Sequence, residues 1–147
     1  MEGKEELVSY KVAKLAKDKG FNWKVIDSFD DKKNPVSRYN IDVDGLDSYI
    51  NTGDEEYIRE VFELNNDQMQ SDFVARPTQS LLQKWLRDKY KINIQIPMYA
   101  NLGTIDYAVS VDQPNDSNTC MCGFEEGSFK TYEKALEIGL EEALKML

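Results

Sequence analysis

The chain has 147 residues, a formal net charge of −9 and no histidine. Hydrophobic residues make up 41% of it and aromatic residues 11%, which is typical of a folded globular protein and not of a disordered one. We expect a single domain, 1–147, with an acidic N-terminal half, 1–70, and a C-terminal half, 71–147. The lack of histidine excludes the commonest general base, Ser–His and Cys–His nucleophile pairs, and imidazole metal ligands.

The acidic excess of the chain lies in one segment. Residues 27–72 contain 13 acidic and 4 basic residues, an excess equal to the whole net charge of −9. Such a field repels nucleic-acid phosphates and attracts cationic partners, so we expect no nucleic-acid partner. No apolar run approaches the roughly 18 to 20 residues of a membrane span, and the charged N-terminus does not have the pattern of a secretory signal. These patterns, with only two cysteines, predict a cytoplasmic protein that does not contact a membrane.

The N-terminal part predicts a helix, two strands and a second helix. Ser9 can cap the first helix, and Gly20 can end it in a left-handed conformation. Thr52 and Glu55 have the spacing of a capping box ahead of the second helix. The strands are predicted from alternating apolar residues, and polar stretches predict the loops. The expected strands are 21–29 and 39–44, separated by a loop at 30–37. The second helix is expected at about 53–64 and is followed by a loop at 65–71.

The C-terminal part predicts a helix, a strand pair, a short strand and a last helix. Pro77 suits the first turn of a helix, because the missing N–H is not needed there. The apolar face of this helix contains Trp85 and three leucines, and Pro97 should break the strand that follows it. The first two expected strands are 92–96 and 105–111, joined by a turn at 101–104. The short strand is expected at 119–124 and the last helix at about 131–146.

The last helix sorts its residues into rows four positions apart. We interpret the acidic row as facing water and the leucine row as core. Between them lies a row of small residues. Gly139 is in the middle of that row, and a mid-helix glycine costs roughly 1 kcal/mol relative to alanine. We therefore expect Gly139 to allow close approach of another backbone. The three rows are Glu133, Glu137, Glu141 and Lys145; Leu136, Leu140 and Leu144; and Ala135, Gly139 and Ala143.

Three segments resemble a family of small uncharacterised proteins from bacteriophages, prophages and related elements of gut bacteria. They are "LVSYKVAKLAKDKGF" at the N-terminus, "PTQSLLQKWLRDKYKINI" in the middle and "TYEKALEIGLEEALKML" at the C-terminus. The likeness covers about 7–21 and 76–147, and it is weaker over the acidic segment 27–72. The family has no known activity, so the resemblance implies a phage or mobile-element setting and assigns no functional residue.

The sequence Cys120-Met121-Cys122 is the most chemically suggestive motif in the chain. On a strand, this spacing places both residues on one side, as a redox pair or half of a thiolate metal site requires. A structural zinc site needs four ligands, and the chain has no further cysteine or histidine to complete one. We therefore expect two small, buried or half-buried thiols without a metal or cofactor.

The aspartates at 42, 44 and 47 give a second candidate site. A calcium-binding EF-hand loop needs glycine at its sixth position and glutamate at its twelfth, whereas Gly45 is only the fourth residue here. We interpret Asp42 and Asp44 as the polar face of a strand. Together with Asp47 they are our candidate partner-binding residues within the acidic segment. The alternative, a coat of charge that only keeps the protein soluble, stays open.

These elements predict an α+β fold with a mostly antiparallel sheet and helices packed on one face. The C-terminal order of elements matches the double-stranded-RNA-binding domain, but three glutamates on the last helix argue against RNA binding. We expect a non-enzymatic accessory protein of a phage or mobile element that binds a cationic host or phage protein. The alternative is a small-molecule or nucleotide-handling protein with its pocket between the sheet and the C-terminal helix.

Overall fold

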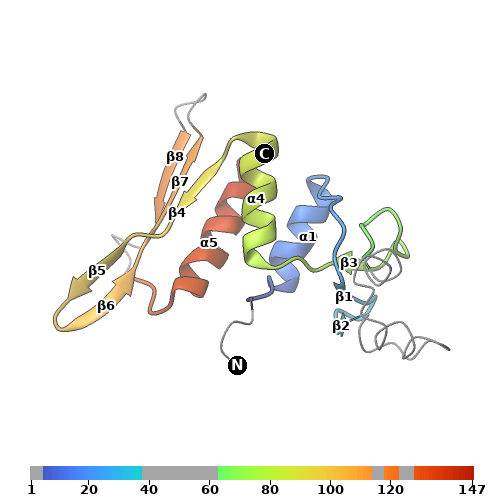
Figure 1. The fold of residues 1–147 in the computed structure, drawn as a ribbon, viewed down its shortest axis with the longest axis horizontal. Coiled ribbons are helices and arrows are strands. Elements are labelled where there is room, and N and C mark those ends of the chain that lie inside the picture. Colours follow the sequence, from blue (N-terminus) through green and yellow to red (C-terminus); the bar gives the residue numbers. More distant parts are fainter. Residues whose placement is uncertain (1–4, 38–62, 114–117, 123–127) are drawn as a thin grey trace, which may run out of the picture.

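The computed structural model describes residues 5–37, 63–113, 118–122 and 128–147 (Figure 1). The predicted α+β fold is confirmed, and every described strand pair is antiparallel. The elements are α1 (Tyr10–Asp18), β1 (Asp27–Phe29), β2 (Pro35–Ser37), β3 (Val74–Ala75), α4 (Gln79–Tyr90), β4 (Asn93–Gln95), β5 (Met98–Asn101), β6 (Thr104–Tyr107), β7 (Val109–Gln113), β8 (Asn118–Cys122) and α5 (Tyr132–Lys145).

The elements are arranged in layers along the molecule (Figure 1). A three-stranded sheet, in the order β4-β7-β8, lies at one end, and a second, in the order β2-β1-β3, lies at the other. Helix α5 contacts β4 and β7 on one side and α1 and α4 on the other. One cluster of buried side chains runs through these layers, from Val8 to Leu144.

Helix α1 forms as its sequence predicts. The Ser9 hydroxyl accepts a hydrogen bond from the Val12 N–H, 3.3 Å away, and so satisfies one of the free donors of the first turn. Gly20 follows the helix with φ +90°, a conformation that suits glycine and ends the helix. Val12 and Ala16 are buried on the face that points into the core.

The segment between α1 and α4 differs from the prediction in two places. The expected strand 21–29 is regular only in β1, although Val25 also forms an isolated bridge with Leu64. The expected loop 30–37 contains strand β2, which pairs with β1. The predicted strand 39–44 and most of the predicted helix 53–64 lie outside the described residues, and the described end of that helix, at Leu64, is in the bridge.

Helix α4 begins at Gln79, two residues after Pro77, which the sequence predicted in its first turn. Thr78 is the N-cap, and its hydroxyl accepts a hydrogen bond from the Leu81 N–H at 3.2 Å. Pro77 therefore precedes the cap, and its carbonyl accepts the Val8 N–H at 3.1 Å. The predicted apolar face is confirmed by Trp85 and its neighbour Leu86, which are fully buried.

The strands after α4 form one long hairpin in two parts. The inner part pairs β4 with β7, and the outer part pairs β5 with β6. The regular pairing is interrupted at Pro97 as predicted, and the Pro97 carbonyl there accepts the Ala108 N–H at 3.0 Å. The turn at 101–104 is also confirmed. Its central residues, Leu102 and Gly103, have φ of +48° and +85°.

The acidic row of α5 faces water only at its two ends, so the prediction is wrong for Glu137 and Glu141. Glu141 is buried and binds Lys11 at 2.7 Å and Lys145 at 3.1 Å. Glu137 accepts the backbone N–H of Ser9 at 2.8 Å and the side-chain amide of Gln79 at 3.0 Å. The row therefore fastens α5 to α1 and to the start of α4. Only its first and last members, Glu133 and Lys145, are exposed.

The close approach predicted at Gly139 is confirmed, but its partners are side chains and not a backbone. A Cβ at this position would lie 2.6 Å from a methyl carbon of Val109 and 2.8 Å from one of Ile94. Both distances are shorter than carbon atoms tolerate, so only glycine fits here without movement of the strands. Gly139 thus sets the spacing between α5 and the inner part of the hairpin.

Candidate functional site

The outer part of the hairpin, β5–β6, projects from the body of the protein (Figure 1). Its register pairs Met98 with Tyr107 and Ala100 with Ile105, and directly opposed residues of antiparallel strands share a face. One face of the projection is therefore made of apolar and aromatic residues, and Leu102 lies at its tip. We call Met98, Ala100, Leu102, Ile105 and Tyr107 the hairpin face.

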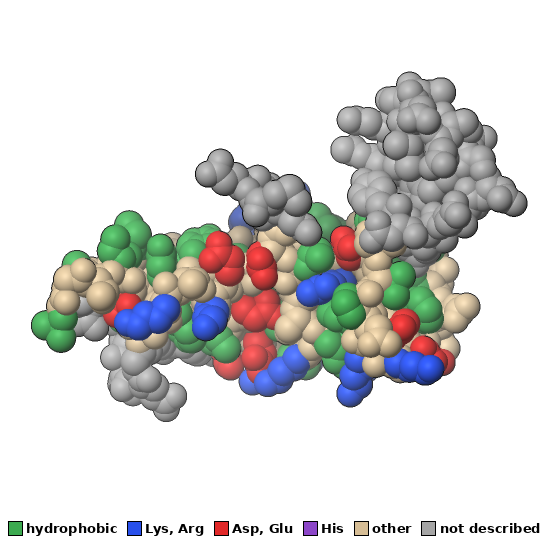
Figure 2. All heavy atoms as spheres, turned by 90° about the horizontal axis from the view of Figure 1, so that it is seen from below, with side chains coloured by type: hydrophobic (Ala, Val, Ile, Leu, Met, Phe, Trp, Pro, Cys, Tyr) green, Lys and Arg blue, Asp and Glu red, His purple; other side chains and the backbone are tan. Residues whose placement is uncertain are grey.

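Much of the hairpin face is open to solvent. Met98 is 63% exposed, Ile105 is 57% exposed, and Leu102 is fully exposed. Tyr132, from the start of α5, extends the face because its ring packs edge-to-face on Tyr107 at 6.2 Å. Figure 2 shows hydrophobic side chains at the end of the molecule where this hairpin lies. Clustered apolar residues of this kind mark surfaces that bind other molecules.

The hairpin carries almost no charge. Asp106 is the one charged residue between Ile96 and Ala108. It is fully buried, and the Lys130 ammonium binds it at 2.8 Å. A buried carboxylate with a cationic partner avoids most of the cost of an unpaired buried charge. The exposed apolar face of the β5–β6 hairpin therefore has no uncompensated charge beside it, because Lys130 balances the charge of Asp106.

The conformation of Leu102 is unusual for its residue type. A two-residue hairpin turn with positive φ at both central positions favours Asn-Gly or Asp-Gly. This turn has Leu-Gly instead, with Leu102 at φ +48°. A left-handed conformation costs a residue with a Cβ about 1 to 2 kcal/mol. Since the side chain is fully exposed, no packing within the described protein offsets this cost.

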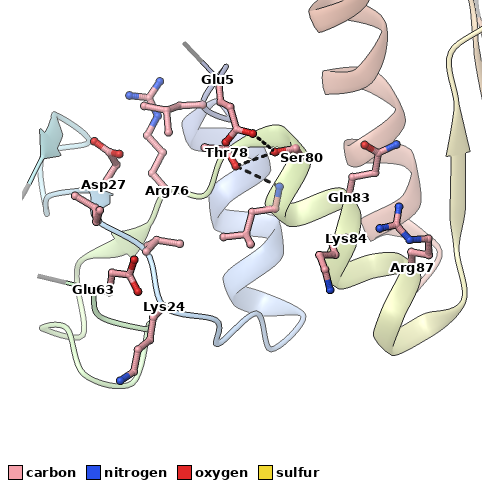
Figure 3. A pocket seen from close by; sticks show the side chains of 14 residues that line it. Glu5, Lys24, Asp27, Glu63, Arg76, Thr78, Ser80, Gln83, Lys84 and Arg87 are labelled. Carbon is pink, nitrogen blue, oxygen red and sulfur yellow. Dashed lines mark hydrogen bonds between the residues drawn. The ribbon is translucent and has the colours of Figure 1, made fainter. Parts of the chain in front are cut away.

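A second candidate site is an open groove of about 680 Å³ along the outer side of α4 (Figure 3). Its lining includes the apolar side chains of Leu7, Val25 and Leu81 together with acids and bases. The basic side chains lie apart from one another along the groove and do not converge on one point (Figure 3). The charged residues that line it are Glu5, Lys24, Asp27, Glu63, Arg76, Lys84 and Arg87.

Several polar groups of this groove are already engaged within the protein. The Ser80 hydroxyl donates to Glu5 at 2.9 Å, and Arg76 donates through Nε to the Val8 carbonyl at 2.8 Å. Lys84 is paired with Asp88, and this hydrogen bond holds the pKa of the Asp88 carboxyl below its usual value. The groove is large enough for a ligand, but these groups would have to exchange partners to bind one.

Only some of the site residues predicted from the sequence lie within the described part of the chain. Asp42, Asp44 and Asp47 lie outside the described residues. The backbone register of β8 places Cys120 opposite Val111 and Cys122 opposite Val109. Among residues 5–37, 63–100, 102–113 and 128–147, no three His, Cys, Asp or Glu side chains come together as a metal site would need. In the same ranges, no helix has the length and apolar character needed to cross a membrane.

Sequence reasoning missed the hairpin face. The alternation of Ile105, Tyr107, Val109 and Val111 predicted one uniform strand with a buried side. The available signals were an uncharged stretch from Ile96 to Ile105 and a leucine in a turn position that favours asparagine. Comparisons with known protein families, with curated protein sequences and with solved structures gave no match.

Proposed function

We propose that this protein is a non-enzymatic binding module that docks another protein on its hairpin face. The observation that carries the proposal is the exposure of Met98, Leu102 and Ile105 together on one projecting element. Burying such side chains contributes roughly 25 cal/mol for each Å² of apolar surface removed from water. The resemblance noted above favours a phage or mobile-element setting for such a module, and we propose a host or phage protein as its partner.

The charge of the chain supports a cationic partner. A net charge of −9 attracts positively charged proteins over a distance of about one Debye length, roughly 8 Å at physiological salt. Asp42, Asp44 and Asp47 are the acidic residues that we propose for this steering. The hairpin face supplies apolar contact after the encounter, and the acidic segment accelerates the encounter itself.

The test compares two matched exposed strand positions. Ile105→Thr removes an apolar contact from the hairpin face while keeping a β-branched residue, and Gln95→Thr introduces the same residue at the exposed last position of β4. Proteins retained from a bacterial extract by the parent chain are purified and titrated by calorimetry. We expect Met98→Thr combined with Ile105→Thr to weaken binding and reduce the negative heat-capacity change, and Gln95→Thr to leave both unchanged. Equal binding by all variants contradicts the proposal.

A second candidate function is small-molecule binding in the groove along α4. Its volume, about 680 Å³, lies within the usual range of ligand sites, roughly 300 to 1,000 Å³. Such a pocket was expected from the sequence between the sheet and the C-terminal helix, but Gly139 of α5 is in close contact there with Ile94 and Val109. Screening metabolites for a rise in melting temperature that Leu81→Glu abolishes tests this function.

A further inference from the structure

We infer that Leu102 is the anchor of the hairpin face and inserts into an apolar pocket on a partner protein. This inference rests on the proposed function and names the residue and the partner chemistry that it requires. Leu102 is fully exposed at the tip of the β5–β6 turn. It is the part of the hairpin face that reaches farthest along the projection, between Asn101 and Thr104.

Two independent observations single out Leu102 from ordinary exposed leucines. The first is exposure: its side chain meets solvent on all sides, whereas leucines are usually at least partly covered. The second is conformation: φ is +48° at a position where asparagine or glycine is favoured. A leucine here weakens the folded protein and contributes no packing within the described chain. A residue that disfavours its own fold and is fully accessible fits a role in binding.

The remainder of the hairpin matches the surroundings of an anchor. Met98 and Ile105 flank the tip on the same face, and both are more than half exposed. Strongly contributing residues lie near the centre of an interface, with neighbours that exclude water around them. Asp106, the charged residue of the hairpin, is buried against Lys130, so no acid of β5 or β6 lies on the apolar side. The pocket that accepts Leu102 is therefore apolar and needs no charged group within it.

Charge and size identify the kind of partner. The net charge of −9 repels anionic membranes, nucleic acids and a second copy of the chain. A stable protein–protein interface buries roughly 800 Å² from each partner, contributed by about 20 to 30 residues, and the hairpin face has fewer residues than that. A small projecting face is buried best when a recess encloses it on several sides. The occupant is thus a protein of net positive charge with an apolar recess wide enough for one leucine side chain.

The test uses Leu102→Asn in the full chain. This change places a favoured residue in the turn, so we expect the melting temperature to rise by roughly 2 to 4 °C. Binding to the partner purified from bacterial extract should weaken about 30-fold, the effect of losing a strong interface contact. Leu102→Met keeps a long apolar side chain and should bind within about threefold of the parent. A rise in stability together with a loss of binding separates an anchor from a residue that only shapes the turn.

Several outcomes overturn the inference. If Leu102→Asn lowers the melting temperature, the strain argument is wrong. If Leu102→Asn binds the partner as the parent does, but the double variant Met98→Thr, Ile105→Thr does not, the proposed function stands and Leu102 is not the anchor of the hairpin face. If no purified protein distinguishes any of these variants from the parent, both proposals fail. If the parent protein sediments as a dimer and Leu102→Asn dissociates that dimer, the occupant is a second copy of the chain and the inference is wrong. If the parent protein binds phosphatidylglycerol vesicles, the occupant is a membrane and the inference is also wrong.

Discussion

The inner and outer parts of the long hairpin differ in what covers them, although their sequences are alike. In the inner part, Ile94 and Val109 are buried beneath α5. In the outer part, Met98 and Ile105 occupy equivalent strand positions and face solvent. The change occurs at Pro97 and Ala108, where regular pairing is interrupted. The comparison teaches that the alternation of apolar residues identifies a strand face but not whether another element covers it.

The largest expected difference between the two parts is in their contribution to stability. Ile94→Ala should lower the free energy of unfolding by about 2 to 5 kcal/mol, because it opens a cavity under α5. Ile105→Ala should change it by less than about 1 kcal/mol, because that side chain is mostly in water. Urea denaturation of both variants measures this difference. Similar losses for the two variants would mean that the outer part is also covered in solution.

Gly139→Leu tests the contact that buries the inner part. The added side chain must displace Val109 and Ile94, whose methyl groups already lie within 2.6 and 2.8 Å of an added Cβ. We expect overpacking to cost about 1 to 3 kcal/mol, measured by thermal or urea unfolding. Lys134→Leu, at an exposed position of the same helix, is the control and should be nearly neutral. A Gly139→Leu variant that melts like the parent would contradict the close packing of α5 on the sheet.

A smaller effect concerns the other side of α5, where Glu141 faces α1. Hydrogen bonds from Lys11 and then Lys145 hold the pKa of the Glu141 carboxyl below its ordinary value of 4.5, against the opposing effect of burial. Because the folded pKa is the lower one, this pair stabilises the fold above pH 4.5 and loses its contribution as the pH falls toward the folded pKa. Glu141→Gln should flatten the acid side of the stability–pH curve, measured by urea unfolding. Identical curves for the two proteins would show that the pair is neutral.

The smallest effect on stability is expected from the acidic segment. Asp42→Asn, Asp44→Asn and Asp47→Asn together remove three charges and should leave the melting temperature almost unchanged. Binding of a cationic partner should weaken through slower association, and the dependence of the association rate on salt should decrease. Changes in the hairpin face should instead act mainly on dissociation. Stopped-flow measurement of both rates distinguishes steering from anchoring, and an unchanged association rate would leave these aspartates as a solubility coat.

The described helices α1, α4 and α5 were predictable because their signals are local. Ser9, Thr78 and Thr131 each cap the helix that follows with a side-chain oxygen, and each lies within three residues of the N–H that it binds. The interruption at Pro97 and the turn at Leu102-Gly103 are also encoded by neighbouring residues. For such features the sequence contains both partners of the interaction within one short window.

The orientation of the acidic row on α5 was not predictable in this way. Glu137 accepts its hydrogen bond from Ser9, 128 residues earlier in the chain, and Glu141 is paired with Lys11. A charged row on a helix usually faces water, and no local feature of α5 indicates that another helix would supply donors to it. The exposure of the hairpin face was missed for a related reason: it depends on where α5 begins relative to the strands.

The central place of α5 has a consequence for the order in which the protein folds during synthesis. Among the described elements, α5 leaves the ribosome last, yet it separates the β4-β7-β8 sheet from α1 and α4. Until it emerges, the apolar surfaces that it covers on both of its sides stay open to solvent. Contacts between such distant segments slow folding and leave intermediates prone to aggregation. Chains that stop before Thr131 should therefore be degraded or bound by chaperones, although most of their helices and strands are already encoded.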